Sequence, residues 1–164
     1  MKFRFARRIA MAVVLLAFAA SAGHAQFTAT QTITYSVNAI NQIAFIGAPS
    51  LTVSTAAAGA APSSVTNATA TWAVTTNQTG AKITASIPAV MPPGLTLSSS
   101  LTAPTGATSA GFLPLGTVAV DLVTGITKIA QGLLVVTYKL DATAAAGVIA
   151  SNSRIVTYTI TGGT

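Results

Sequence analysis

Polar and apolar residues alternate with a strict period of two in five separate stretches of this chain. These stretches are residues 32–37, 68–75, 82–87, 95–98 and 156–161. Successive side chains of an extended strand point to opposite faces, so each stretch would place apolar groups on one face and hydroxyls on the other. Thr, Val and Ile favour strands because their branched side chains pack well on a pleated surface. The alternation predicts half-buried β-strands.

The remaining segments fit the same interpretation. Two segments, 118–123 and 133–140, are more continuously apolar and predict more buried strands, and residues 51–54 predict a shorter one. Turn-forming residues lie between the strands, at 76–80, 91–94, 104–106, 124–125 and 131–132. Helical periodicity is absent, and residues 141–147 would form one helical turn at most. Strands at intervals of roughly 8–12 residues predict an all-β fold, an antiparallel Ig-like β-sandwich of about seven to nine strands.

The first 25 residues have the order of a secretory signal peptide. Four basic residues precede an apolar run at 9–20, and small residues follow at 21–25. The apolar run is shorter than the roughly 20 residues of a membrane-spanning helix. We expect cleavage after Ala25, with cleavage after Ala22 and an uncleaved membrane anchor as alternatives. Residues 26–164 would then form a single β-sandwich domain without an integral membrane segment.

Removal of residues 1–25 changes the charge of the chain. Four of the eight basic residues and the only histidine lie in this segment, which leaves a net charge of +2. The remaining charged residues are scattered along the chain: Lys82, Lys128, Lys139, Arg154, Asp121 and Asp141. Nucleic-acid binding requires a basic face that neutralises several phosphates. We therefore expect no nucleic-acid partner.

The composition of residues 26–164 also excludes most catalytic chemistry. This segment has no His, Cys or Glu, so Ser–His–Asp and Cys–His machinery and the usual zinc sites are impossible. Asp121 and Asp141 could share a proton as a carboxylate pair, but turn or strand-end positions are the more ordinary use of aspartate. We predict that the protein is not an enzyme and has no catalytic, cofactor-binding or metal-binding residues.

Four large residues are candidate core anchors. Trp72 and Val74 share the apolar face of the segment 68–75, and Tyr158 and Ile160 share that of 156–161. A sugar-stacking role is the alternative for the aromatic residues. Asn67 and Asn77 each begin an Asn-x-Thr triplet, the acceptor pattern for N-glycosylation, whose use depends on the host.

Residues 26–37 form a long alternating segment directly after the expected cleavage site. Ile33, Tyr35 and Val37 lie on its apolar face. The segment could be the first strand of its own sandwich, or it could insert as a donor strand into a neighbouring subunit. Because charged residues that normally prevent edge-to-edge pairing are scarce, the sheet edges are open to such addition. Head-to-tail insertion does not close and would produce a homopolymeric filament.

The ending at residues 153–161, Ser-Arg-Ile-Val-Thr-Tyr-Thr-Ile-Thr, resembles that of small exported bacterial surface β-sandwich proteins. Among these are pilin-like subunits of the spore-coat-U type, which end in a similar Thr/Val/Tyr strand. The general character of the sequence is similar over residues 26–164. A shared motif is limited to the terminal strands. The chain departs from those pilins because it lacks a cysteine pair and continues through residues 162–164. No site residues are carried over from the resemblance.

These observations favour a non-enzymatic structural protein, a subunit of an extracellular filament or surface layer that assembles by β-strand addition. The alternative is a monomeric secreted adhesive or ligand-binding module that uses its loops, especially 88–94 and 104–114. In both cases we expect a secreted or cell-surface protein, exported through the periplasm if the host is a diderm bacterium.

Overall fold

The structure, a computed structural model, describes residues 27–164, so the expected signal peptide lies outside the described residues. The chain divides into a unit that ends at Ser36 and a compact unit from Val37 to Thr164. Every strand of the described residues lies in the second unit.

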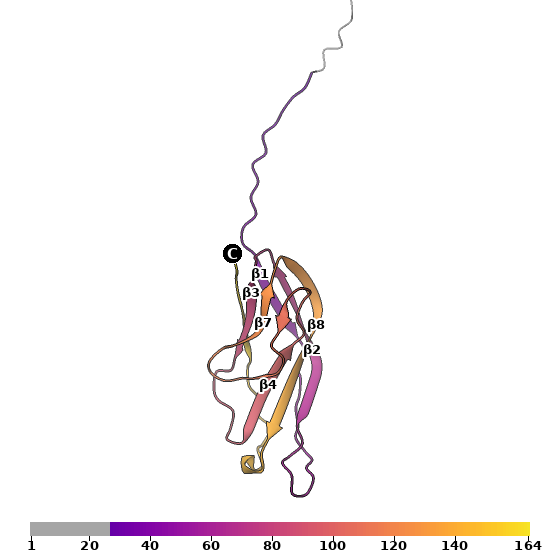
Figure 1. Cartoon of the computed structure of the whole chain (residues 1–164), viewed down its shortest axis with the longest axis vertical. Coiled ribbons are helices and arrows are strands. Elements are labelled where there is room, and N and C mark those ends of the chain that lie inside the picture. Colours follow the sequence, from indigo (N-terminus) through magenta and orange to yellow (C-terminus); the bar gives the residue numbers. More distant parts are fainter. Residues whose placement is uncertain (1–26) are drawn as a thin grey trace, which may run out of the picture. The chain divides into compact units, whose positions relative to one another are not determined.

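Two antiparallel sheets make up the unit from Val37 to Thr164, which confirms the predicted all-β, antiparallel fold (Figure 1). The five-stranded sheet contains, in spatial order, β1 (Asn41–Ile46), β2 (Val65–Thr76), β8 (Ile129–Ala142), β4 (Leu95–Leu101) and β6 (Leu113–Pro114). The four-stranded sheet contains, in spatial order, β5 (Thr108–Ser109), β7 (Val120–Ile126), β3 (Ala81–Ser86) and β9 (Thr157–Thr161). A single short 3-10 turn, η1 (Ala144–Ala146), follows β8 in the described part of the chain.

The core lies between the two sheets and follows from the alternation of the sequence. In β3 every second residue is buried, at Ala81, Ile83 and Ala85. Burial of such side chains contributes roughly 25 cal/mol for each Å² of apolar surface removed from water. The other fully buried large side chains come from both sheets and include Trp72, Leu101, Leu122, Ile126 and Val136. With no cysteine in the chain, this core holds the two sheets together without disulfide bonds.

Two of the predicted turns are instead β-bulges inside strands. Gly125 lies within β7, and Gly132 lies within β8, where the pairing shifts between Trp72 and Val74 of β2. Gly125 has a φ of 75°, a backbone conformation that glycine adopts without a steric penalty. A bulge places an extra residue in one strand and increases its twist. Because a bulge and a turn both favour glycine, the sequence of a bulge can resemble that of a turn although the chain does not reverse.

Two predicted strands are absent from the described residues. Residues 27–40, which include the alternating segment 32–37, form no strand, and neither do residues 51–54. Alternation creates a face that can be buried, but a strand also requires a neighbour for its backbone hydrogen bonds. Neither segment has such a neighbour in the structure. The remaining predicted strands correspond to β2, β3, β4, β7, β8 and β9, with shifted ends.

Candidate functional site

The two sheets differ in the length of their strands. β2 and β8 contain 12 and 14 residues, whereas β3 and β9 of the opposite sheet contain 6 and 5. The ladder between β3 and β9 ends where Ser86 pairs with Thr157. The ladder between β4 and β8 continues to the pair of Leu95 with Ala142. Loops therefore replace strands opposite this part of the five-stranded sheet.

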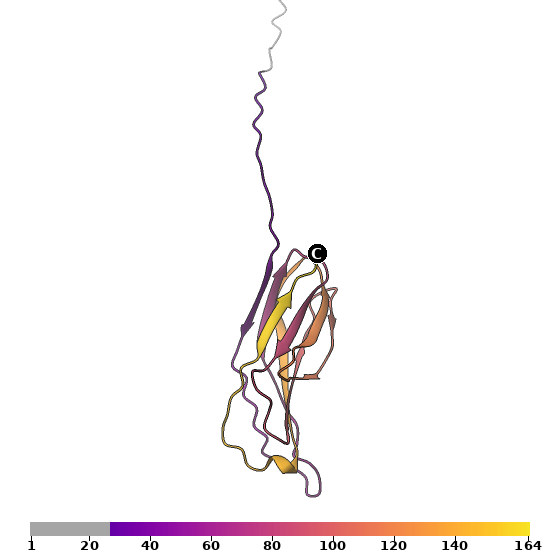
Figure 2. The ribbon, with the colours of Figure 1, turned by 90° about the vertical axis from the view of Figure 1, so that its left-hand side faces the viewer.

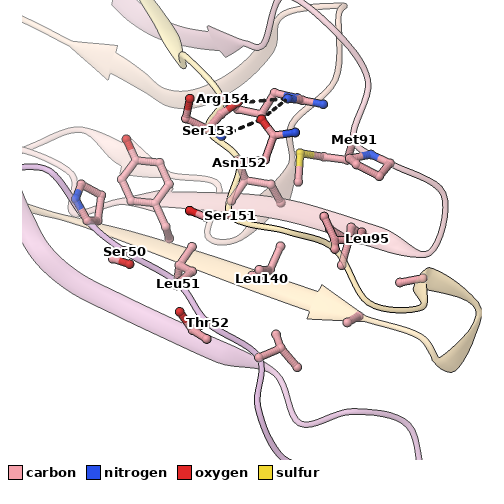
Figure 3. Close-up of a pocket in the computed structure, with 18 of the residues that line it drawn as sticks. Ser50, Leu51, Thr52, Met91, Leu95, Leu140, Ser151, Asn152, Ser153 and Arg154 are labelled. Atoms are coloured by element: carbon pink, nitrogen blue, oxygen red, sulfur yellow. Dashed lines mark hydrogen bonds between the residues drawn. The ribbon is translucent and has the colours of Figure 1, made fainter.

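An open groove of about 1020 Å³ occupies this region (Figure 3). Its floor carries apolar side chains of β4 and β8, including Leu95, Leu97 and Leu140. One wall is the irregular segment 47–56 after β1, and the other is the segment 147–156 before β9. Both walls are extended chain without strand partners, apart from an isolated bridge between Ala56 and Pro62. The groove is thus long, largely apolar in its floor and bounded by two segments whose backbones lie outside any strand.

The groove continues into a seam between the edge strands β1 and β9. These two strands lie beside each other, in different sheets (Figure 2). β1 pairs only with β2, and β9 pairs only with β3, so each strand has one edge without a strand partner among the described residues. Side chains along the seam are only partly buried although they pack against the core, namely Ile43, Phe45, Val156, Tyr158 and Ile160. These side chains are therefore incompletely covered along this side of the sandwich.

An aromatic group joins the seam to the core. The rings of Phe45 and Tyr158 stack with centroids 3.9 Å apart, and Phe45 also stacks on Trp72 at 5.9 Å. The Tyr158 hydroxyl donates to the Tyr138 hydroxyl at 2.7 Å, so Ser99 Oγ, 3.2 Å away, is the donor to Tyr158. Burial raises the pKa of Tyr138 and, more strongly, that of Tyr158. Both phenols are therefore neutral at physiological pH and serve in packing and hydrogen bonding.

We expect this tyrosine pair to make the protein sensitive to alkali. Both pKa values are higher in the folded state than the value of about 10 in the unfolded chain. Their contribution to stability is therefore complete below pH 10 and decreases as the pH rises toward the folded-state pKa values, by up to about 1 kcal/mol per pH unit for each tyrosine. Denaturant unfolding at pH 8, 10 and 11 should show this decrease, and Tyr158→Phe should reduce it by about half. If stability decreases equally in Tyr158→Phe and in the wild type, the sensitivity to alkali does not come from the tyrosine pair.

Arg154 is the charged residue on the groove wall. Its Nη1 donates to Ser153 O at 3.0 Å and to Asn152 Oδ1 at 3.4 Å, which holds the guanidinium against its own segment. In Figure 3 the side chain points toward the side of the groove where Met91 lies. Its Nε is buried and forms no hydrogen bond with the described residues.

The two aspartates do not form a pair. Asp121 of β7 makes an ion pair with Lys82 at 3.0 Å, and Asp141 of β8, in the other sheet, makes one with Lys139 at 3.0 Å. Asp141 also accepts a short hydrogen bond from Ser64 Oγ, which, with Lys139, holds its pKa below the usual range. Each carboxylate has its own lysine, so they cannot share a proton. Among residues 27–164, no three His, Cys, Asp or Glu side chains gather in a way that could hold a metal ion.

The residues predicted for subunit contact and for the core lie in different environments. Ile33, Tyr35 and Val37 are 74%, 89% and 79% exposed. Trp72 and Val74 are buried at the centre of β2, and Tyr158 and Ile160 of β9 are partly buried at the seam. The seam thus contains two of the four expected core anchors.

The two Asn-x-Thr triplets have structural roles of their own. Asn67 Oδ1 accepts from the backbone N and the hydroxyl of Thr69, and its Nδ2 donates to Ser50 O on the groove wall. Asn77 fastens the chain before β1, because its Oδ1 accepts from Ile40 N at 2.8 Å and its Nδ2 donates to Asn38 O at 2.7 Å. Both side-chain amides are therefore engaged by neighbouring segments.

Sequence reasoning missed the groove and Arg154. The unequal lengths of the strands would have been the only signal, and the bulges at Gly125 and Gly132 concealed it because they resembled turns. Residues 51–54 were expected to be a strand, yet they contribute to the groove wall instead.

Comparison with protein-family models, with curated proteins and with solved structures finds no match to this chain. In residues 27–164 no helix combines the length and apolar character that crossing a bilayer requires.

Proposed function

We propose that this protein is a non-enzymatic, secreted structural subunit of an extracellular filament or surface layer, and that its subunits join by β-strand addition. Residues 1–25 direct export and are removed. Residues 37–164 form an Ig-like sandwich that receives a strand, and residues 26–37 of a second copy supply it. The proposal places the protein outside the cell or on its surface, with itself as partner.

Two observations carry this proposal: the core is incompletely covered along the seam, and the chain carries an exposed apolar segment. Five partly buried side chains of the core line the seam, and the groove continues from it. Ile33, Tyr35 and Val37 are exposed on one face of a segment that forms no strand. An added strand would form hydrogen bonds with a free sheet edge and place alternate side chains in the groove.

The positions of the two surfaces favour an open polymer. Asn77 holds residues 38–40 at the turn between β2 and β3, so the segment 27–37 leaves the sandwich there. This turn lies near the end of the sequence, because Thr79 and Thr164 exchange backbone hydrogen bonds of 3.0 and 3.2 Å. The groove includes Ala142 and Ala146, at the end that carries η1 (Figure 1). A donor at one end and an acceptor toward the other give head-to-tail contacts that do not close.

Truncation of the exposed segment tests this proposal. We expect residues 26–164 to form concentration-dependent oligomers and fibres, as measured by light scattering after size-exclusion chromatography and by electron microscopy. We expect residues 38–164 to stay monomeric, since they keep the sandwich and lose the donor. A matched control carries Thr28→Ser and Thr30→Ser, which alter the opposite face of the segment conservatively and should leave assembly intact.

Two results would contradict the proposal. One is a chain 26–164 that stays monomeric at high concentration with its amides at 26–37 protected from hydrogen exchange, which would place the segment in its own groove. The other is that residues 38–164 assemble as well as residues 26–164 do.

The second candidate is a monomeric secreted module that binds a ligand or adheres through its loops. The groove supports it, because a cleft of about 1020 Å³ with an apolar floor and polar groups on its walls matches the sites that bind small molecules or extended peptides. The expected loop 104–114 contains the short strands β5 and β6, and Phe112 between them is 44% exposed, with Lys139 Nζ 5.6 Å from its ring. Binding of the monomeric chain 38–164 to cell surfaces or to a glycan array would favour this candidate. Absence of binding in both assays would count against it.

A further inference from the structure

We propose that residues 26–37 of a second copy pair their backbone with Leu51 and Val53, on the groove wall that follows β1, and not with the wall that precedes β9. Residues 49–54 would then become a strand. This inference rests on the proposed function. It adds to that function the acceptor edge, because it states which of the two walls supplies the backbone hydrogen bonds.

The wall after β1 has the burial pattern of a strand without the partner of one. From Pro49 to Ser54, the odd-numbered residues are partly buried and the even-numbered residues are exposed, which is the period of an extended strand. Within the described part of the chain, the N–H and C=O groups of Leu51 and Val53 form no backbone hydrogen bonds. The segment therefore lacks only a neighbour to be a strand.

Asn67 of β2 determines which edge of this wall is free. Its Nδ2 donates to Ser50 O at 3.0 Å, so the carbonyl of Ser50 points toward β2. Backbone groups of successive residues in an extended chain point to opposite edges, so those of Leu51 and Val53 point away from β2. Among the described residues β1 also pairs with β2 alone, so the free edge of this wall continues the free edge of β1.

The unpaired stretch has a defined length. Pro49 has no N–H, which restricts pairing to the residues after it and suits an edge strand. The alternation of burial stops after Ser54, and Thr55 O accepts a hydrogen bond from Ser63 N at 2.8 Å. The free edge between these limits consists of the backbone groups of Leu51 and Val53.

The wall before β9 is already engaged by its own side chains. Asn152 Oδ1 accepts from Ser153 N at 2.8 Å, and Arg154 Nη1 donates to Ser153 O at 3.0 Å, so both backbone groups of Ser153 have local partners (Figure 3). An added strand would have to displace these contacts in order to pair there. The wall after β1 presents no such competition at Leu51 and Val53.

The side chains of the wall after β1 also suit an apolar strand. Leu51 packs against the core and lines the groove together with Leu97 and Leu140 of its floor. A strand beside Leu51 would therefore place alternate side chains over this floor. Residues 47–56 include no charged residue, so the charges that normally prevent edge-to-edge pairing are absent from this wall.

Hydrogen exchange of the chain 26–164 tests the inference without any substitution. The chain is labelled in its assembled form and at a dilution where it is monomeric, and exchange is read for single residues by mass spectrometry with fragmentation in the gas phase. We expect the amides of Leu51 and Val53 to exchange about tenfold more slowly in the assembled form, because they become hydrogen-bonded. The amides of residues 152–156 should change much less.

Proline substitution tests the same hydrogen bond through assembly. We expect Val53→Pro to raise the concentration at which half of the chain is assembled by about tenfold relative to Val53→Ala, since both remove the valine side chain and only proline removes the N–H. Thr52→Pro against Thr52→Ala is the matched control: its N–H points to the edge that faces β2, so the two variants should assemble equally. Circular dichroism shows whether each variant folds, and the exchange experiment does not depend on it.

The outcomes separate this inference from the proposed function. A chain 26–164 that does not assemble overturns both. If the chain assembles, protection at residues 152–156 that equals or exceeds protection at Leu51 and Val53 overturns the choice of wall alone. Equal assembly of folded Val53→Pro and Val53→Ala has the same meaning, because the N–H of Val53 would then have no role in pairing.

Discussion

Replacing Trp72 with alanine is expected to lower the free energy of unfolding by about 3–5 kcal/mol, the range for truncation of a large aromatic residue in a packed core. Trp72 is 1% exposed, pairs with Phe45 across β1 and β2, and stacks on its ring. The alanine would leave a cavity at the point where the seam meets the core. Because domains of this size are stable by only about 5–15 kcal/mol, the variant should be near the limit of folding.

Denaturant titration followed by circular dichroism checks this expectation, with Trp72→Phe as the matched control. Trp72 Nε1 is buried without an acceptor in the described part of the chain. Phenylalanine removes this unpaired N–H and retains most of the apolar volume, so it should cost much less than alanine. A loss below 1 kcal/mol in Trp72→Ala would show that Trp72 is not central to the core.

Addition of a synthetic peptide with the sequence of residues 26–37 is expected to raise the melting temperature of residues 38–164 by about 10 °C at a hundredfold excess over its dissociation constant. At that excess a ligand that binds only the folded state contributes about 2.7 kcal/mol, and each kcal/mol corresponds to several degrees in a domain of this size. The peptide would cover the seam residues Ile43, Phe45 and Tyr158, which are only partly buried without it. Thermal unfolding at increasing peptide concentration measures the shift.

Two controls make the peptide experiment specific. A peptide with Ile33→Thr and Tyr35→Thr keeps its length and β-propensity but loses its apolar face, and it should produce no shift. A domain with Ala142→Arg places a long side chain in the groove without removing a core residue, and it should bind the peptide weakly. An equal shift with the threonine peptide would show that the added strand pairs without using the groove.

Alternation in the sequence predicted most of the sandwich because a period of two has one structural meaning. A strand such as β3, with Ala81, Ile83 and Ala85 inward, is specified by its own residues. Glycine positions predicted turns less reliably than alternation predicted strands, since Gly125 and Gly132 lie in bulges and not in turns. A glycine reports that the backbone needs conformational freedom, and both a turn and a bulge need it.

The candidate site was only partly predictable. Ile33, Tyr35 and Val37 were singled out from their alternation and from their place after the signal peptide, and the structure leaves them exposed outside any strand. The groove could not be inferred, because it depends on the difference in length between two sheets that are packed together. Arg154 lies in an irregular segment whose sequence offers no periodic pattern, and only the packing shows that its Nε is buried.

The sequence by itself determined which segments can be strands, which of their faces are apolar, and that residues 26–164 contain no histidine, cysteine or glutamate for catalysis. These properties are local or compositional, so they require no knowledge of neighbours. The tertiary structure decided which strands are paired, that β1 and β9 each keep an edge without a strand partner among the described residues, and that the apolar side chains between them are only partly buried. Pairing and closure depend on contacts between residues distant in the chain, which no local pattern encodes.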